Sequence, residues 1–186
     1  MSDQPTAPRS SDTKPSGLVQ TGKVVSVNTS PRKTVRKTPV ERCYVIENQG
    51  LEGDAHGGDW HRQVSLLALE SIETMRDKGL DVGPGDFAEN ITTEGIDLLA
   101  LPVGSTVEIG EGLKLEITQI GKVCHTRCAI YYQAGDCVMP KEGIFAVVKH
   151  GGDVAVGDEV RATAVTATPA PPGPPSAEPE LGPTSS

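Results

Sequence analysis

Three of the four cysteines of this chain gather in one short segment, as Cys124, Cys128 and Cys137. Lys122, His125 and Arg127 surround the first of them, and cationic neighbours lower the pKa of a thiol and enlarge its thiolate fraction. A thiolate is both a nucleophile and a metal ligand. The residue types around Cys124 therefore predict one of these two roles.

The cysteines leave several interpretations open. Cys124 alone could act as nucleophile or thiolate ligand. The three clustered thiols, with His125 or another histidine, could hold zinc, because the spacing of Cys124 and Cys128 is usual for zinc ligands. With Cys43 added, the same thiols could hold an iron–sulfur cluster. Cys43 itself stands in an apolar alternation, which favours simple packing.

A second candidate site is the glycine-rich loop of residues 50–63. Glycines let backbone amides approach a ligand closely, and such loops cradle anions. The loop carries side chains that suit a phosphate, and we expect a binding role for Gly53, Asp54, His56, His61 and Arg62. The alternative is an ordinary turn in which Asp54 binds its own backbone. The loop of residues 85–90 is a weaker candidate, because Asp86, Glu89 and Asn90 are common turn and cap residues.

The composition limits the classes of protein to which this chain can belong. A formal charge of −8 argues against a general nucleic-acid binder, although residues 32–37 form a local basic patch. No apolar run is long enough to span a bilayer, and the N-terminus lacks the pattern of a secretory signal. We therefore expect no nucleic-acid or membrane partner and a reduced, cytoplasmic location.

Short β-rich segments separated by glycines dominate the middle of the chain. They predict strands over residues 22–28, 40–46, 64–67, 106–109, 113–118, 143–149, 154–156 and 158–165. Residues 106–109 and 113–118 alternate around two glycines, which is typical of a hairpin. One helix is expected, with Leu69, Ile72 and Met75 on one face and Gly79 ending it.

Many short strands and one principal helix predict a mainly β protein, a closed or nearly closed β-barrel. The barrel domain is expected over residues 17–165, which are enough to bury a hydrophobic core. Residues 1–16 and the Pro- and Ala-rich residues 166–186 lack apolar periodicity and are expected to be disordered tails.

Several segments together resemble the MOSC family, named for the C-terminal domain of molybdenum-cofactor sulfurases. The resemblance extends over residues 23–160 and rests on residues 37–40, 50–65, 84–97, 103–110, 143–148 and 152–158, together with the cysteine that follows Gln119. It implies a barrel like that of the pyruvate-kinase barrel domain, with a cysteine at the rim of a pocket. Cys124 takes the position of the family's molybdenum ligand. Lys37, Asn90 and Lys122 join the loop residues as expected cofactor-binding residues.

The resemblance implies a protein that uses the Cys124 thiolate to bind the molybdenum cofactor (molybdopterin), as a cofactor carrier or in handling its sulfur. Molybdopterin, molybdoenzymes and an electron-donor or sulfur-donor protein are then the expected partners. Three alternatives remain open: a molybdenum-dependent reductase of N-hydroxylated compounds, a persulfide sulfurtransferase, and a non-catalytic zinc-binding barrel. The extra thiols Cys128 and Cys137 depart from the family's single cysteine. We expect no pyridoxal phosphate, NAD or flavin as cofactor. Sulfurases carry a separate pyridoxal-phosphate domain, for which this chain has no room, so a complete sulfurase is not expected either.

Overall fold

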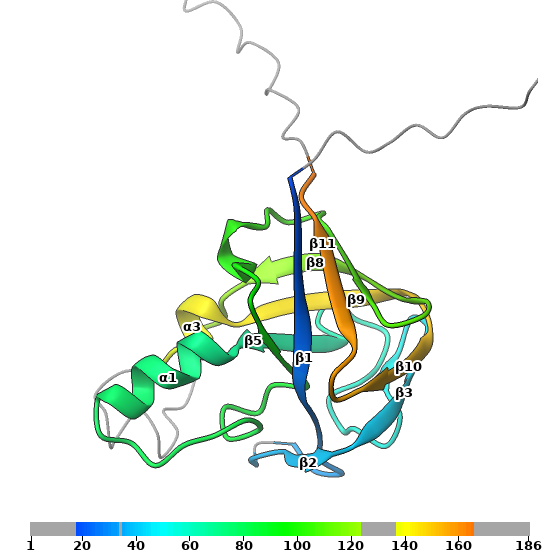
Figure 1. Ribbon diagram of the computed structural model, residues 1–186. Helices are drawn as coiled ribbons and strands as arrows, with labels where there is room; N and C mark the ends of the chain where they lie inside the picture. The colour runs from blue at the N-terminus through cyan, green and yellow to red at the C-terminus, as the bar shows by residue number, and fades with distance from the viewer. Residues whose placement is uncertain (1–17, 34, 124–136, 166–186) are drawn as a thin grey trace, which may run out of the picture.

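The computed structural model describes residues 18–33, 35–123 and 137–165. Seven strands form a closed barrel in the order β11-β7-β8-β9-β5-β6-β1, and pairing of β11 with β1 closes the ring. The strands are β1 (Val19–Thr29), β5 (Val64–Ala68), β6 (Ile91–Glu94), β7 (Thr106–Ile109), β8 (Leu113–Ile120), β9 (Ile144–His150) and β11 (Glu159–Thr163). Figure 1 shows β1 and β11 side by side along the barrel. The predicted closed β-barrel is therefore confirmed.

Neighbouring barrel strands are antiparallel except for β5 and β6, which run parallel. Parallel neighbours need a crossover connection, and here it contains helix α1 (Leu69–Asp77). Gly79 follows the helix with a φ of +87° and donates to Arg76 O, as expected for a glycine that ends a helix. The predicted helix and the predicted β7–β8 hairpin are thus both present.

Outside the barrel, a small sheet has the order β10-β3-β4. It consists of β3 (Arg42–Ile46), β4 (Gly50–Leu51) and β10 (Gly152–Ala155). β2 (Thr38–Val40) pairs with the end of β1 instead. The strand predicted over residues 40–46 is therefore wrong in one respect, since a bend at Glu41 divides it between two sheets.

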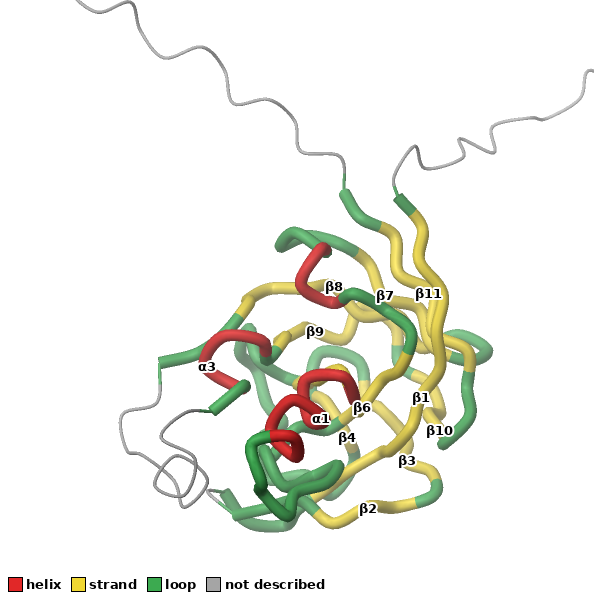
Figure 2. Tube along the Cα trace, turned by 60° about the vertical axis from the view of Figure 1, so that its left-hand side comes forward, coloured by secondary structure: helices red, strands yellow, loops and turns green. Residues whose placement is uncertain are grey.

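Two hydrophobic clusters stabilise the fold. The first fills the barrel with inward side chains such as Val107, Ile109, Leu113, Leu115 and Ile117, which alternate with outward residues along β7 and β8. The second joins α1 to the outside of the barrel and to the short helix α3 (Met139–Glu142), which the sequence analysis did not predict. Figure 2 shows α1 and α3 on the same side of the barrel. No helix in the described part of the chain has the length and apolar character of a membrane span.

Candidate anion-binding site

A buried ion pair lies at the centre of the candidate site. Lys37 precedes β2, and Asp54 follows the turn after β4. Lys37 Nζ lies 2.8 Å from Asp54 Oδ2, with the two side chains 1% and 0% exposed. The backbone of Lys37 is fixed as well, because its N–H donates to Gly85 O at 2.9 Å.

The Asp54 carboxylate is held by several donors. Its Oδ1 accepts from Ser30 N at 2.9 Å, and its Oδ2 accepts from His56 N at 3.2 Å. Burial alone would raise the pKa of Asp54, but its contacts with His56 and Lys37 hold that pKa far below the ordinary value. Asp54 is therefore ionised at neutral pH. Gly53 makes the preceding turn, for which its φ of +74° is required.

Burial lowers the pKa of Lys37, while the hydrogen bond and the charge of Asp54 oppose this shift. The charges of Glu89 and Lys122 also act on Lys37, in opposite directions. The ammonium group of Lys37 thus depends on Asp54 to remain charged inside the protein.

His56 and Arg62 each bury a side-chain nitrogen that has no hydrogen-bond partner among the described residues. His56 Nδ1 lies 3.7 Å from Asp54 Oδ2, too far for a hydrogen bond. Arg62 Nε is also buried without an acceptor. A buried, unpaired polar group costs free energy, so both nitrogens favour a ligand that brings acceptor atoms.

Two aromatic rings hold the Arg62 guanidinium group. Its Cζ lies 4.6 Å from the centre of the Trp60 ring and 5.6 Å from that of Phe145. Trp60 Nε1 donates to His56 O at 3.0 Å, which connects this cluster to the ion pair. Lys122 Nζ lies 5.9 Å from the centre of the same Phe145 ring. These contacts bring Lys37, Asp54, His56, Arg62 and Lys122 into one continuous network.

The network contains three cationic side chains, those of Lys37, Arg62 and Lys122, and one ion-paired carboxylate, that of Asp54, while Glu89 acts on Lys37 through its charge. The two unpaired nitrogens add hydrogen-bond donors, and a donor next to positive charge is what an anion requires. The arrangement is therefore suited to an anionic ligand. Trp60 and Phe145 were not among the predicted site residues, because their contacts with Arg62 arise only in the folded chain.

Two of the predicted ligand residues are already engaged with other parts of the protein. Exposed His61 has its Nε2 2.9 Å from Gln119 Oε1, and its carbonyl accepts from Thr118 Oγ1. Asn90 is buried, its Oδ1 accepting from both Ser65 N and Ser65 Oγ at about 3 Å. Asn90 Nδ2 donates to Asn28 O, so its side chain ties β5 to β1. Ligand binding by these two residues stays a prediction.

Glu89 is a buried residue that supports the loop next to Lys37. Its Oε1 accepts from Gly85 N at 2.6 Å and from Thr92 Oγ1 at 2.9 Å, while its buried Oε2 has no hydrogen-bond partner in the described part of the chain. Burial raises the pKa of this carboxyl group. Through Gly85 it supports the same loop that fixes the Lys37 backbone. The residue type of Glu89 predicts a turn or cap role, but the sequence does not predict that its side chain is buried.

The cysteines fall into different surroundings. Cys124 and Cys128 lie outside the described residues, so the roles expected of them stay predictions. Cys137 is 8% exposed and packs in the hydrophobic cluster beside α1 and α3. Cys43 packs against the barrel core, and burial raises the pKa of its thiol, in keeping with a packing role. Among residues 18–33, 35–123 and 137–165, no three His, Cys, Asp or Glu residues cluster as metal ligands would.

A family model for the MOSC domain matches residues 52–161, more than half of the chain. This protein therefore belongs to the MOSC domain family. A comparison with curated protein sequences gives no match.

Several solved structures share the fold of this protein. The YuaD protein from Bacillus subtilis is 18% identical with a TM-score of 0.69, and the match covers 81% of this chain and 100% of that protein. YiiM from Escherichia coli is 20% identical with a TM-score of 0.57, and the match covers 78% of this chain and 71% of that one. YiiM from Geobacillus stearothermophilus is 19% identical with a TM-score of 0.57, covering 76% and 75%. At these identities the likeness establishes the fold.

Proposed function

We propose that this protein binds the molybdenum cofactor, with the Cys124 thiolate as molybdenum ligand, and acts as a cofactor carrier or in handling the cofactor's sulfur. Membership of the MOSC family supports the choice of cofactor. The molybdenum cofactor is a pterin with a terminal phosphate, so its binding site needs donors for an anion and for a polar ring.

The unpaired nitrogens of His56 and Arg62 carry this proposal. They lie in a network that contains three cationic side chains and one carboxylate, and its donors are matched to an anionic ligand. Lys122, two residues before Cys124 in the sequence, belongs to the same network. The residues present are therefore compatible with the cofactor.

Each side chain of the network has a task in this proposal. Arg62, held between Trp60 and Phe145, binds the phosphate with little loss of side-chain freedom, because the rings already restrict it. Asp54 keeps Lys37 charged and orients the His56 backbone. The Cys124 thiolate supplies a ligand that the protein contributes to the metal. When bound, the molybdenum centre supplies the redox or sulfur-exchange chemistry.

The Arg62→Ala variant tests the proposed anion contact. We expect it to weaken cofactor binding by about 1.5–3 kcal/mol, the value of a hydrogen bond to a charged group. The measurement is the pterin content per chain, determined by fluorescence after release and oxidation, for protein purified from a cofactor-producing host. Arg161→Ala is the matched control, because Arg161 is an exposed arginine on β11. Equal pterin contents in Arg62→Ala, Arg161→Ala and the unaltered protein would remove Arg62 from the proposed site.

A further inference from the structure

The carboxyl group of Glu89 is buried beside the candidate site but makes none of the anion contacts described above. The residue is fully buried, and its Oε2 has no hydrogen-bond partner among the described residues. The other oxygen, Oε1, accepts from Gly85 N at 2.6 Å and from Thr92 Oγ1 at 2.9 Å. A buried oxygen without a partner costs free energy, and it costs more when the carboxyl group is ionised. A proton on Oε2 would remove that charge.

The backbone next to Glu89 adopts an uncommon conformation. Ala88 has a φ of +63°, which residues with a Cβ atom rarely adopt. Ala88 N donates to Gly85 O at 3.0 Å, and the same oxygen accepts from Lys37 N at 2.9 Å. One carbonyl oxygen thus joins the turn before Glu89 to the backbone of Lys37. Strained backbone of this kind gathers at functional sites, which favours a role for Glu89 beyond capping.

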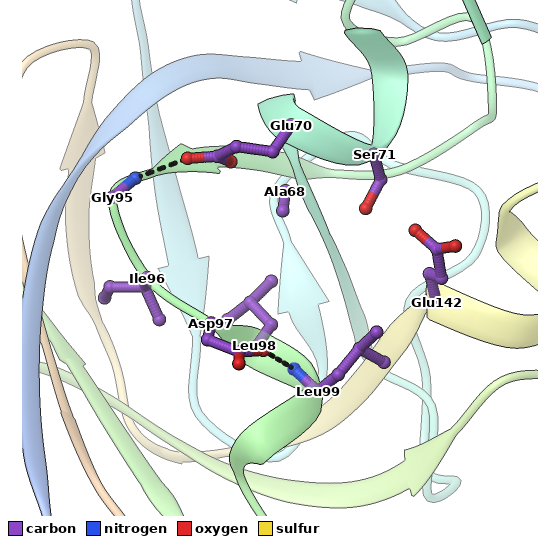
Figure 3. A pocket seen from close by; sticks show the side chains of 9 residues that line it. All are labelled: Ala68, Glu70, Ser71, Gly95, Ile96, Asp97, Leu98, Leu99 and Glu142. Carbon is purple, nitrogen blue, oxygen red and sulfur yellow. Dashed lines mark hydrogen bonds between the residues drawn. The ribbon is translucent and has the colours of Figure 1, made fainter. Parts of the chain in front are cut away.

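Glu70 provides a comparison outside the site. Its carboxylate accepts from Gly95 N at 2.9 Å, at the wall of a cavity of about 290 Å³ beside the 3-10 helix η1 (Leu98–Ala100) (Figure 3). Glu70 is exposed, so water can solvate its carboxylate. Glu89 has the same kind of contact with a glycine amide but no such exposure, and burial raises the pKa of its carboxyl group.

Glu89 acts on the anion site through its charge. Burial lowers the pKa of Lys37, and the charge of Glu89 is among the effects that oppose this shift. Lys37 is also the cation whose Nζ lies 2.8 Å from Asp54 Oδ2. An anion bound beside Lys37 and an ionised Glu89 would repel each other, because like charges interact strongly where little water screens them. A protonated Glu89 removes this repulsion.

The surroundings of Glu89 limit the groups that exchange a proton in its place. The polar side chains next to it on β1, β5 and the start of β6 are neutral, namely Ser26, Asn28, Ser65, Asn90 and Thr92. The charged or titratable side chains of the adjoining connections include Arg36, Lys37, Asp54, His56, Asp86 and Lys122. Arg36 pairs with Asp86, and ionised Asp54 pairs with Lys37. His56 is therefore the residue that an experiment must separate from Glu89.

We propose that anion binding at the Lys37 network is linked to uptake of a proton by Glu89, which thereby sets the pH range in which the site accepts an anion. This inference rests on the proposed function, because it concerns the same anion site. The proton comes from the solvent and is held on Oε2. Glu89 acts on the ligand through Lys37 and does not contact it.

The direction of the pH dependence follows from the raised pKa of Glu89. At a pH below that pKa the group is neutral, and the cations of the site attract the anion without opposition. At a higher pH the ionised group opposes binding, and a bound anion raises the pKa further. Anion affinity should therefore fall as the pH rises through the pKa of Glu89. A further rise of about one pKa unit on binding corresponds to about tenfold in affinity.

Sulfate is the probe, because it stays a dianion from about pH 5 to about pH 8, where carboxyl groups with a raised pKa titrate. Isothermal titration calorimetry at constant ionic strength measures its affinity for the full-length protein, purified from a host that does not make the cofactor. Runs in two buffers of different ionisation enthalpy give the number of protons taken up. We expect the affinity to fall by about tenfold over this range, with net proton uptake on binding.

Variants assign the proton to one residue. Glu89→Gln keeps an acceptor for Gly85 N and carries no charge, so its sulfate affinity should change by less than about twofold over the same range. Glu70→Gln is the matched control and should keep the full pH dependence. His56→Gln should bind sulfate more weakly and still keep the pH dependence. Circular dichroism checks that each variant is folded.

Two kinds of failure can be told apart. Sulfate binding to the unaltered protein without pH dependence or proton uptake would overturn this inference, whether or not Glu89→Gln folds, and would leave the anion site standing. A pH dependence that persists in full in Glu89→Gln, or that disappears only in His56→Gln, would overturn it as well. Absence of sulfate binding to the unaltered protein at every pH would refute the proposed anion site itself, and this inference with it.

Discussion

Lys37 Nζ and Asp54 Oδ2 lie 2.8 Å apart in the interior of this protein, with both side chains almost fully buried. The two residues come from separate connections, one before β2 and one after β4. Their pairing therefore fastens the glycine-rich loop to the β1–β2 connection. A buried charge that loses its partner is strongly unfavourable, so the pair makes the geometry of the site depend on both residues.

The first prediction concerns this ion pair. Asp54→Asn should lower the free energy of unfolding by about 3 kcal/mol, because it leaves the Lys37 charge buried without compensation. Urea unfolding followed by circular dichroism measures the change. Glu94→Gln is the control, since it breaks the exposed Lys23–Glu94 pair and should cost less than about 1 kcal/mol. If Asp54→Asn cost no more than Glu94→Gln, the ion pair would not hold the loop.

The second prediction is a pH dependence due to Glu89. Burial raises the pKa of Glu89 in the folded protein above its unfolded value of about 4.3. Its contribution to stability is therefore fully present below about pH 4.3 and is lost as the pH rises through the folded pKa. Glu89→Gln does not titrate, so the stability of the unaltered protein relative to this variant should fall as the pH rises from about 4 toward neutrality.

Unfolding free energies at several pH values measure this difference. Glu108→Gln changes an exposed carboxylate on β7 and is the control. Its unfolding free energy should change with pH nearly as that of the unaltered protein does. A stability difference between the unaltered protein and Glu89→Gln that does not change with pH would contradict the buried, weakly acidic state of Glu89.

The third prediction concerns the close approach of Gly85 to Lys37. Gly85 has a φ of +86°, and a Cβ atom there would lie 2.4 Å from Lys37 O. Gly85→Ala should therefore cost about 3 kcal/mol or more, from overlap as well as backbone strain. Gly157→Ala separates the two effects, because Gly157 has a φ of +93° with no atom within 4 Å of such a Cβ. Urea unfolding should give about 1–2 kcal/mol for this control, and equal costs would rule out the overlap.

The barrel could be predicted from the sequence because its strands alternate locally. Leu113, Leu115 and Ile117 point into the core at every second position, and the glycines that separate β7 from β8 mark the turn. The division of the 40–46 strand at Glu41 could not be predicted, since it depends on two different pairing partners. Helix α3 is too short to show a helical period, and contacts within the second hydrophobic cluster stabilise it.

The candidate site was predicted in part. Asp54, His56 and Arg62 stand in one glycine-rich loop, so their residue types alone suggested an anion site. The burial of Lys37 against Asp54 is a tertiary feature, as is the position of Arg62 between Trp60 and Phe145. The sequence analysis offered a second role for Asp54, a turn in which its side chain binds nearby backbone. The structure shows such a contact, since the Asp54 carboxylate accepts from His56 N. One side chain here serves both the turn and the ion pair.

The fourth prediction tests the central claim, that Cys124 provides the molybdenum ligand. The measurement is the molybdenum, zinc and pterin content of protein purified from a cofactor-producing host, for the unaltered chain, Cys124→Ala and Cys43→Ala. We predict near-stoichiometric molybdenum and pterin in the unaltered chain and in Cys43→Ala, because Cys43 packs against the core. Cys124→Ala should fold normally and lose the molybdenum. Molybdenum retained in full by Cys124→Ala, or zinc without pterin in the unaltered chain, would contradict the proposal.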